Sequence, residues 1–285
     1  MPTQKDYTSN YKPTWCPGCG NFSISPATKK AFSDLNLDTH KIMMSFGIGC
    51  SSNGANFYNL YSVHGIHGRA LPVAVGVKLA NQEMTVLADS GDGDAYGEGL
   101  SHFISTARSD VNITYLVHDN HLYSLTKGQM SPTSLRGMKT KSTPFGSLNE
   151  PFNPLATAII NGATFVAQGF SGDIAHLTEL IKLGIQHKGF ALINILQICP
   201  TFNKFNTFDW YKERTFHVED VQHDKNDKDK AIDLVTKDDE KLPLGVIYQA
   251  DKPTFGEQLP QIEDETLVKQ SIENIDISES LENYK

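Results

Sequence analysis

The chain has 285 residues, 39% of them hydrophobic and 20% charged, and its formal net charge is −8. These values are typical of a globular protein with a substantial core, and one large domain suffices at this length. The acidic balance, without a basic stripe, argues against a nucleic-acid binder. The polar N-terminus lacks the apolar core of a secretory signal, and the longest apolar segment, residues 70–80, is too short to span a membrane. We therefore expect a cytoplasmic protein that contacts neither nucleic acid nor membrane.

Apolar runs of strand length alternate along the chain with longer segments of helical spacing. The predicted strands cover residues 40–46, 84–88, 113–117, 164–168 and 190–196. The predicted helices cover residues 22–35, 73–80, 97–107 and 153–161, and Ser171-Gly172-Asp173 offers the N-terminal cap of a further helix. The unbroken apolar run at 190–196 is typical of an interior strand of a parallel sheet. The alternation predicts an α/β fold, with a mostly parallel sheet and helices on both faces.

Polar segments follow two of the predicted strands. Gly91-Asp92-Gly93-Asp94 follows the strand at 84–88, and Asp119-Asn120 follows the strand at 113–117. Ligands of α/β sheets bind at the carboxyl ends of parallel strands. Glycine lets the backbone approach a phosphate, and Asp and Asn supply hard oxygen donors suited to Mg²⁺. A glycine-rich turn alone means little, but the two strand ends together predict a diphosphate held through a metal.

The spacing of these residues strengthens the prediction, because 26 residues separate Gly93 from Asn120. This arrangement resembles the thiamine-diphosphate motif, in which Gly-Asp-Gly is followed at such a separation by Asn. The resemblance implies that Mg²⁺ is held by Asp92, Asn120 and the backbone carbonyl of Leu122. The motif usually ends in Asn-Asn, whereas Asp119 comes first here, a departure that leaves the final ligand in place.

The four cysteines, Cys16, Cys19, Cys50 and Cys199, each lie in a loop that contains glycine or proline. Four thiolates suit either a tetrahedral zinc site or a [4Fe-4S] cluster, and disulfides are not expected in the cytoplasm. Structural zinc sites usually use two short paired spacings, whereas this chain has one Cys-x-x-Cys pair and two distant single cysteines. The pattern favours a cluster and leaves zinc open.

Two polar segments are expected to border the site. Residues 122–132 are punctuated by glycine, which predicts a loop over the cofactor, and residues 133–152 predict a surface excursion or an ordering lid. Before the helix at 73–80, His67 and Arg69 can face a diphosphate, because phosphates bind cationic and hydrogen-bonding groups.

The C-terminal part of the sequence carries a different pattern. Residues 219–241 are dense in Asp and Lys and predict a solvated helix, while the acidic residues 250–285 predict an extended arm that can pack on another subunit. We therefore divide the chain into residues 1–206, a domain that binds the cofactors, and residues 207–285, a C-terminal extension packed on the same domain or on a partner subunit.

Several tracts follow one another over about the first 200 residues: WCPGCG at 15–20, GIGCS at 47–51, HGIHGRALP at 64–72, GDGD at 91–94, and KGQMSPTS at 127–134. In this order they resemble the β subunit of the 2-oxoacid:ferredoxin oxidoreductases. The resemblance implies a thiamine-diphosphate-binding fold that holds thiamine diphosphate, Mg²⁺ and one [4Fe-4S] cluster. It also implies an α subunit as partner.

Carried onto this chain, the resemblance assigns the site residues. The cluster ligands are Cys16, Cys19, Cys50 and Cys199. The residues that line the coenzyme are Ile48, Gly49, Cys50, Ser51, His67, Gly93, Asp94, Ser124 and Leu125. Lys127 matches a position near the substrate. No catalytic acid or base is assigned here, because the family takes the carboxylate that activates the coenzyme from the α subunit.

The reaction that the resemblance implies is the CoA-dependent oxidative decarboxylation of a 2-oxoacid to acyl-CoA and CO₂, with electrons passed through the cluster to ferredoxin. Two other functions stay open: a non-redox thiamine-diphosphate decarboxylase with a structural zinc site, and a non-catalytic electron-transfer subunit. The intact Asp92 and Asn120 argue against the latter. The 2-oxoacid itself is not determined, since its side-chain pocket is shared with the α subunit, and pyruvate, 2-oxoglutarate and branched-chain acids are all candidates.

Overall fold

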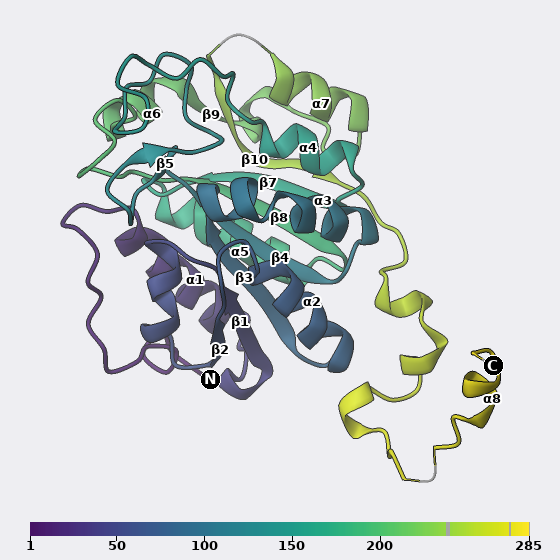
Figure 1. Cartoon of the computed structure of the whole chain (residues 1–285). Coiled ribbons are helices and arrows are strands. Elements are labelled where there is room, and N and C mark those ends of the chain that lie inside the picture. The colour runs from purple at the N-terminus through teal and green to yellow at the C-terminus, as the bar shows by residue number, and fades with distance from the viewer. Residues whose placement is uncertain (238–239, 274, 285) are drawn as a thin grey trace.

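An eight-stranded sheet runs through the molecule in the strand order β2-β1-β3-β4-β8-β7-β10-β9 (Figure 1). The computed structural model describes residues 1–237, 240–273 and 275–284. The strands of this sheet are β1 (Ile42–Phe46), β2 (Tyr61–His64), β3 (Thr85–Gly91), β4 (Ile113–Asp119), β7 (Phe165–Phe170), β8 (Phe190–Leu196), β9 (Thr215–His217) and β10 (Leu242–Gln249). Neighbouring strands are parallel except for the β7–β10 pair. The predicted α/β class with a mostly parallel sheet is confirmed.

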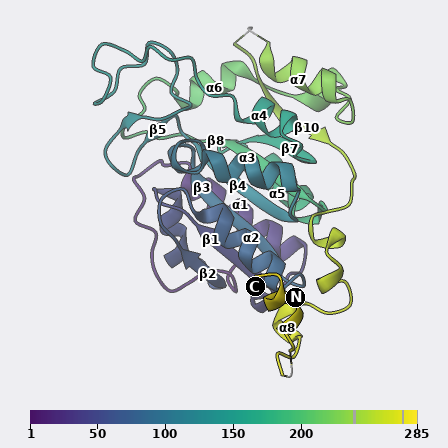
Figure 2. The same ribbon diagram turned by 45° about the vertical axis from the view of Figure 1, so that its right-hand side comes forward.

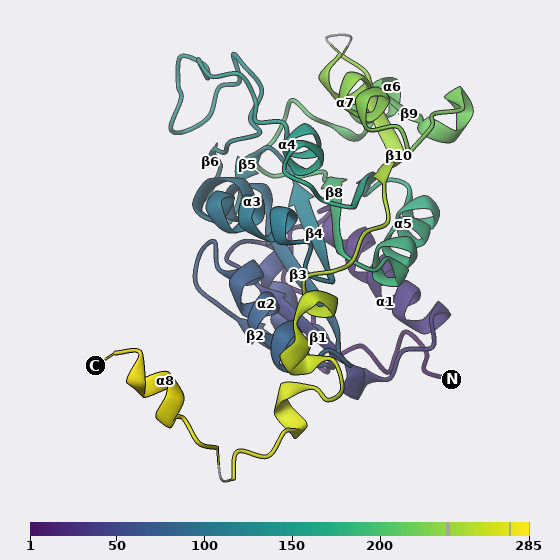
Figure 3. The same cartoon turned by 90° about the vertical axis from the view of Figure 1, so that its right-hand side faces the viewer.

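Helices cover both faces of the sheet, as predicted. They are α1 (Asn21–Asp34), α2 (Ala70–Ala80), α3 (Leu100–Ser109), α4 (Pro154–Ile160), α5 (Ile174–Gln186), α6 (Phe208–Arg214), α7 (Lys228–Thr236) and α8 (Ser278–Glu282). Figure 3 shows α1 and α5 on one side of the sheet and α2, α3, α4 and α7 on the other. Among the described residues, no helix is long and apolar enough to cross a bilayer.

The interior strand β4 supplies side chains to two separate cores. In β4, Ile113, Tyr115 and Val117 face the core beneath α2, α3 and α4. Leu116, which lies between them in sequence, faces the core beneath α1 and α5. Successive side chains of a strand point to opposite faces, so a strand covered on both sides is apolar throughout. This is why the apolar runs of β4 and β8 were sufficient to predict strands, and the run of β8 an interior one.

The five predicted strands are confirmed as β1, β3, β4, β7 and β8, and four predicted helices are confirmed as α1, α2, α4 and α5. The helix predicted at 97–107 begins differently. A π-helix, Asp94–Glu98, precedes α3, and Gly93 already has helical dihedral angles, with φ −62° and ψ −45°. The acidic segment after β3 is therefore the first turn of a helical stretch rather than an open turn.

An edge strand and a small pair of strands were not predicted from the sequence. Strand β2 lies at the edge of the sheet, parallel to β1, and all of its residues are exposed. Within residues 122–132, β5 (Leu122–Tyr123) and β6 (Gln129–Met130) form a small antiparallel pair instead of a plain loop. Strand β2 alternates apolar and polar residues over only four positions, and β5 and β6 have two residues each, so none of them carries a pattern long enough to predict a strand.

The solvated helix predicted at 219–241 is wrong over most of its length. Helix α7 occupies only the middle of this range, and residues 238–239 lie outside the described residues. Strands β9 and β10, on either side of α7, both join the main sheet. Pro243 and Gly245 interrupt the apolar run of β10, and both residue types are depleted in strands, which hides this strand in the sequence. The sheet therefore crosses residue 206, and our division of the chain there stays a prediction.

After β10 the chain leaves the body of the molecule as an extended arm that ends in α8 (Figure 2). The hydroxyl group of Thr266 anchors its first half through hydrogen bonds of 2.9 and 3.2 Å to the main chain at the C-terminal end of α2. The arm predicted for residues 250–285 is confirmed for the described residues, which omit 274 and 285. Its packing on another subunit stays a prediction.

Candidate functional site

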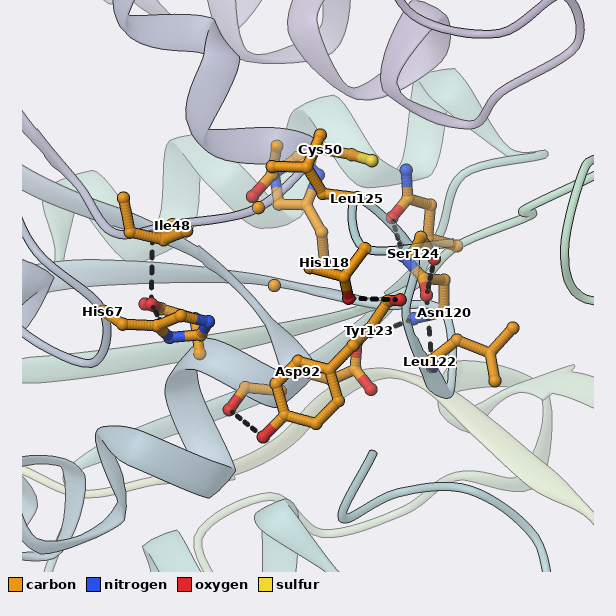
Figure 4. Close-up of a pocket in the computed structure, with 17 residues that line it drawn as sticks. Ile48, Cys50, His67, Asp92, His118, Asn120, Leu122, Tyr123, Ser124 and Leu125 are labelled. Carbon is orange, nitrogen blue, oxygen red and sulfur yellow. Dashed lines mark hydrogen bonds and ion pairs between the residues drawn. The ribbon is translucent and has the colours of Figure 1, made fainter. Parts of the chain in front are cut away.

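The carboxyl ends of β1, β3, β4 and β8 border one cavity (Figure 4). These strands are neighbours in the sheet, and the segments that follow them meet at one edge. The cavity is lined by Ile48, Gly49, Cys50, Ser51, His67, Gly91, Asp92, Gly93, Asp94, His118, Asn120, Leu122, Tyr123, Ser124, Leu125, Thr126 and Gln197. This set contains every residue predicted to line the coenzyme and all three predicted Mg²⁺ ligands. Their roles toward a ligand stay predictions.

Asp94 connects the segments that form the walls of this cavity through hydrogen bonds. Its carboxylate accepts hydrogen bonds from the N–H groups of Ile48 (2.9 Å) and Gly68 (2.7 Å) and from Ser90 Oγ (2.7 Å). These bonds fasten the segments after β1 and before α2 to the end of β3. A Cβ atom on Gly47 would stand 1.9 Å from Asp94 Oδ2, so only glycine allows this close approach. Asp94 therefore shapes the cavity, and its oxygen atoms are already engaged.

His67 and Arg69 are neighbours in sequence but lie in different surroundings. His67 lines the cavity, with Nδ1 at 2.8 Å from Asp94 Oδ1 and at 3.2 Å from Glu98 Oε2. Arg69 is not among the lining residues, and its guanidinium donates instead to the main-chain carbonyl of Glu98 at 3.3 Å. Of the two residues expected to face a diphosphate, only His67 borders the space in which one could lie.

Asp92 and Asp119 are two buried carboxylates at the ends of β3 and β4, only 1% and 3% exposed. The hydroxyl oxygen of Thr133 lies 2.9 Å from Asp92 Oδ2 and 2.7 Å from Asp119 Oδ1, and Ser131 Oγ also donates to Asp92. Burial, followed by the nearby charge of Asp119, raises the pKa of Asp92 to about 7. A cation at Asp92 would offset both effects. The pair therefore fits a bound Mg²⁺.

Asn120 is oriented by the turn that follows β4. Its Oδ1 accepts hydrogen bonds from Ser124 Oγ (2.7 Å) and from the N–H of Leu122 (3.2 Å). Its own N–H donates to Asp92 Oδ1 at 3.4 Å and so joins the two strand ends. An amide oxygen has two lone pairs, so a metal ion at Oδ1 takes the place of one donor. The Ser124 hydroxyl can rotate away, which makes the arrangement compatible with metal binding.

A second cavity contains all four cysteines. It is lined by Thr14, Trp15, Cys16, Cys19, Cys50, Asn53, Asn120, Ser124, Leu125, Gln197, Cys199, Pro200, Thr201 and Phe202. None of the cysteines is in a disulfide. The loop before α1, the end of β1 and the end of β8 thus bring thiols that are distant in sequence to a common space, as the sequence pattern suggested.

Burial and the neighbouring cysteines disfavour the thiolate forms of Cys19 and Cys50 in the absence of a metal. Burial is the first cause that raises the pKa of Cys19 to about 11 and that of Cys50 to about 12, and the charges of the other cysteines add to it. Among the described residues, no three cysteine sulfurs lie within 4.8 Å of one another. A tetrahedral zinc ion, with Zn–S bonds of roughly 2.3 Å, would hold its sulfurs about 3.8 Å apart. As they stand, the four thiols are therefore not preset as the ligands of a single zinc ion.

Gln197 lies in the wall between the two cavities and contacts both sides. Its Oε1 accepts a hydrogen bond from Asn120 Nδ2 at 3.1 Å, and its Nε2 lies 3.5 Å from Cys19 Sγ. The same Nε2 donates to Asn21 Oδ1 at 2.8 Å, and Asn21 Oδ1 is also 2.8 Å from His118 Nδ1. One hydrogen-bonded network therefore joins the metal-ligand candidate Asn120 to the thiol of Cys19.

The sequence analysis missed Gln197, His118 and Tyr123. Gln197 and His118 stand at the carboxyl ends of the apolar runs of β8 and β4, where a polar residue is a detectable signal. Tyr123 carries no such signal. Its ring is close to Gly93, where a Cβ atom would meet it at 2.4 Å.

The chain after β5 contains Lys127, which was predicted to lie near the substrate, and the start of the predicted surface excursion. Lys127 is exposed in the turn between β5 and β6, with φ +79°, and lines neither cavity, although the nearby Leu125 lines both. Its position near a substrate stays a prediction. Thr133 and Ser134, in contrast, are each only 2% exposed. The surface excursion predicted for 133–152 is therefore wrong at its start, because the Thr133 hydroxyl reaches the buried carboxylates.

Comparison with known proteins agrees with this geometry. Residues 28–195 match the family described as "Thiamine pyrophosphate enzyme, C-terminal TPP binding domain", and residues 199–264 match the family of the C-terminal region of the pyruvate ferredoxin oxidoreductase beta chain. The second match extends the family likeness beyond the first 200 residues that carry the motifs. It also includes β9 and β10, the strands that the sequence pattern did not predict.

Individual relatives support the same assignment. The β subunit of a 2-oxoacid:ferredoxin oxidoreductase from a Sulfolobus species is 42% identical over 276 residues, covering 91% of this chain and 90% of the relative. The 2-oxoglutarate oxidoreductase subunit KorB of Mycobacterium tuberculosis is 45% identical over 199 residues, covering 70% of this chain and 53% of the relative.

A solved structure is similar along the whole chain. The 2-oxoglutarate:ferredoxin oxidoreductase of Magnetococcus marinus, with 2-oxoglutarate, coenzyme A and succinyl-CoA bound, superimposes with a TM-score of 0.92 at 38% identity and covers 100% of this chain and 96% of that one. The chain therefore belongs to the β subunits of the 2-oxoacid:ferredoxin oxidoreductases, thiamine-diphosphate enzymes that act together with an α subunit.

Proposed function

We propose that this chain, assembled with an α subunit, oxidises a 2-oxoacid to acyl-CoA and CO₂, with coenzyme A as acyl acceptor and ferredoxin as electron acceptor. The observation that carries the proposal is the wall shared by the two cavities. The side chains common to both are Cys50, Asn120, Ser124, Leu125 and Gln197. A coenzyme on one side and a redox centre on the other would face each other across these residues.

In this proposal the first cavity holds thiamine diphosphate and Mg²⁺. Asp92, Asn120 and the Leu122 carbonyl would be the protein ligands of the metal, and the buried Asp92–Asp119 pair supports a cation there. When bound, the coenzyme supplies a nucleophilic carbon for the keto group and accepts the electron pair released with CO₂. The residues of the chain bind and orient, and Asp94 holds the walls of the cavity in place.

The second cavity would hold one [4Fe-4S] cluster through Cys16, Cys19, Cys50 and Cys199. The four free thiols around one cavity support a metal centre there, and their arrangement along the sequence, one Cys-x-x-Cys pair and two distant single cysteines, favours a cluster over zinc. When bound, such a cluster supplies one-electron transfer. Four unpaired thiols also suit the reducing cytoplasm, where we place the protein.

The substrate contacts are shared with the α subunit. We assign no acid or base in this chain to activation of the coenzyme, and we propose that the exposed Lys127 reaches the carboxylate of the 2-oxoacid in the assembled enzyme. The Magnetococcus marinus enzyme was solved with 2-oxoglutarate bound, which makes 2-oxoglutarate the first substrate to test. Pyruvate and a branched-chain 2-oxoacid complete the panel.

The test is an anaerobic assay of the chain co-expressed with its α subunit. We expect the reduction of ferredoxin to require both a 2-oxoacid and coenzyme A, and acyl-CoA to form. The chain alone should bind its cofactors but turn over no substrate. A complex that releases aldehyde without reducing ferredoxin, and that contains zinc in place of iron, would refute the proposal in favour of a non-redox decarboxylase. Iron without any thiamine diphosphate would instead indicate an electron-transfer subunit.

A further inference from the structure

Three metal-ligating side chains meet away from both cavities, where α5 begins beside the edge strand β9. Asp173 precedes the first turn of α5, His176 lies within that turn, and His217 ends β9. One ligand atom from each lies within 4.8 Å of the others, and this is the only such group of His, Cys, Asp or Glu among residues 1–237, 240–273 and 275–284. The three residues line neither of the cavities described above.

Contacts among the three residues already hold their side chains close together. Asp173 Oδ1 accepts the hydrogen bond of the His176 N–H at 3.1 Å and so caps α5. Its other oxygen, Oδ2, lies 3.4 Å from His217 Nε2. The rings of His176 and His217 are 4.4 Å apart between centroids. One carboxylate oxygen and two imidazoles therefore converge without using the atom that caps the helix.

The ring of His176 lacks the partners that a buried imidazole needs. Both of its nitrogen atoms are shielded from solvent, and neither makes a hydrogen bond. An unsatisfied buried polar atom destabilises the folded chain, and a metal ion would give this ring a partner. The three residues are each partly exposed, so the group lies near the surface.

We propose that Asp173, His176 and His217 bind a divalent transition-metal ion such as Zn²⁺, with water completing its coordination. Imidazole nitrogens with a carboxylate oxygen suit zinc, nickel and iron, whereas Mg²⁺ and Ca²⁺ prefer oxygen ligands alone. The ion joins β9, a strand of three residues, to α5. Its role is to fasten the C-terminal strands to the body of the sheet, and it is independent of the proposed catalytic function.

The test uses the full-length chain in complex with its α subunit, purified anaerobically so that the cysteines keep their own metal centre. Calorimetric titration with Zn²⁺ should show saturable binding, and X-ray absorption at the zinc edge should show nitrogen and oxygen ligands with imidazole scattering. Bound zinc should also raise the midpoint of thermal unfolding, because only the folded state holds the site.

Variants of the three residues test whether each of them is a ligand of the bound Zn²⁺. His176→Gln and His217→Gln should each weaken Zn²⁺ binding by more than about tenfold and remove the thermal shift. Asp173→Asn keeps the oxygen that caps α5 but loses the charge, so a weaker affinity with an unchanged metal-free melting temperature separates ligation from helix capping. His64→Gln, in the exposed strand β2, is the matched control. Equal Zn²⁺ affinity in all variants, or a zinc site with sulfur ligands, would overturn the proposal.

Discussion

The strand ends around the two cavities and the chain beyond β8 are built in opposite ways. At the strand ends polar side chains are buried and bonded to one another: Asp94 accepts three hydrogen bonds, and Thr133 reaches two carboxylates. Beyond β8 the chain adds two strands at the edge of the sheet and then runs outward in an arm that exposes Ile272 and Tyr284. Buried polar groups specify one arrangement, whereas an exposed arm is free to take its shape from a partner.

The difference between the two regions predicts what substitutions in each of them should affect. At the strand ends each side chain shares its bonds with others, so one substitution alters both metal affinity and stability. In the arm the side chains mostly face solvent, so substitutions should affect association rather than folding. The predictions below test this difference, from the largest expected effect to the smallest.

The largest effect is expected from the loss of one cysteine. Cys199→Ser replaces the sulfur of a residue that is only 6% exposed by an oxygen, a poor ligand for an iron–sulfur cluster. We expect nearly all bound iron to be lost and ferredoxin reduction to fall by at least about a hundredfold. Iron and sulfide analysis of anaerobic protein measures the first effect. Thr201→Ser, in the same cavity, is the control, and an unchanged iron content in Cys199→Ser would contradict the four-cysteine assignment.

Asp92→Asn should have the next largest effect. The amide keeps the size of the side chain but loses the charge, so we expect the affinity for thiamine diphosphate in the presence of Mg²⁺ to fall by about a hundredfold. Without cofactors the variant should be at least as stable as the parent, because the repulsion from Asp119 is gone. Calorimetric titration and thermal unfolding measure both. Asp233→Asn, at a position away from both cavities, should change neither, and parental affinity in Asp92→Asn would rule out Asp92 as a ligand.

The same carboxyl group predicts a dependence of stability on pH. Its pKa is about 7 in the folded chain against an ordinary value of 3.8, so between about pH 4 and 7 the cofactor-free folded state binds a proton that the unfolded state has lost. The free energy of unfolding should therefore fall as the pH rises through this range, by a few kcal/mol. Denaturant titrations at several pH values measure this slope. The contribution should vanish in Asp92→Asn, and identical slopes in parent and variant would contradict it.

A smaller effect, on both cavities together, is expected from Gln197→Leu. Leucine keeps much of the volume but leaves Asn120 Nδ2 without its acceptor, at a cost of about 1–3 kcal/mol in stability. Loss of the N–H group near Cys19 Sγ should also lower the reduction potential of a bound cluster. Thermal unfolding and a redox titration measure the two effects. A variant with neither effect would show that the two cavities are independent.

The smallest effect on folding is expected in the arm. A chain that ends after residue 270 keeps the Thr266 anchor on α2, and all the described residues that it loses are exposed. We expect its melting temperature to stay within about a degree of the parent, since surface changes alter stability by roughly 0.5 kcal/mol or less. Its association with the α subunit, followed by sedimentation, should weaken. A large fall in melting temperature with unchanged association would mean that the arm belongs to the folded body.

The sequence-based predictions were accurate where burial produces a local sequence pattern, and they failed where it does not. The interior strands β4 and β8 were predictable because burial on both faces makes them apolar throughout, and Asp92, Asn120 and the cysteines were conspicuous because they follow such strands or lie in loops that contain glycine or proline. Strand β10 was hidden by Pro243 and Gly245, and β2 by its exposure. The burial of Thr133 was not predictable, since a hydroxyl group that serves a buried carboxylate looks like any other loop residue.

By itself the sequence determined the local elements, the kinds of donor atoms and the family that its motifs resemble, because periodicity, composition and spacing are properties of short segments. Only the tertiary structure decided which strand ends are neighbours. The placement of β8 beside β4 sets Gln197 against Asn120, and that of β9 beside β10 brings His217 to the start of α5. Strand order depends on the packing of the whole sheet, and for this reason the shared wall of the cavities and the histidine–aspartate group appear only in three dimensions.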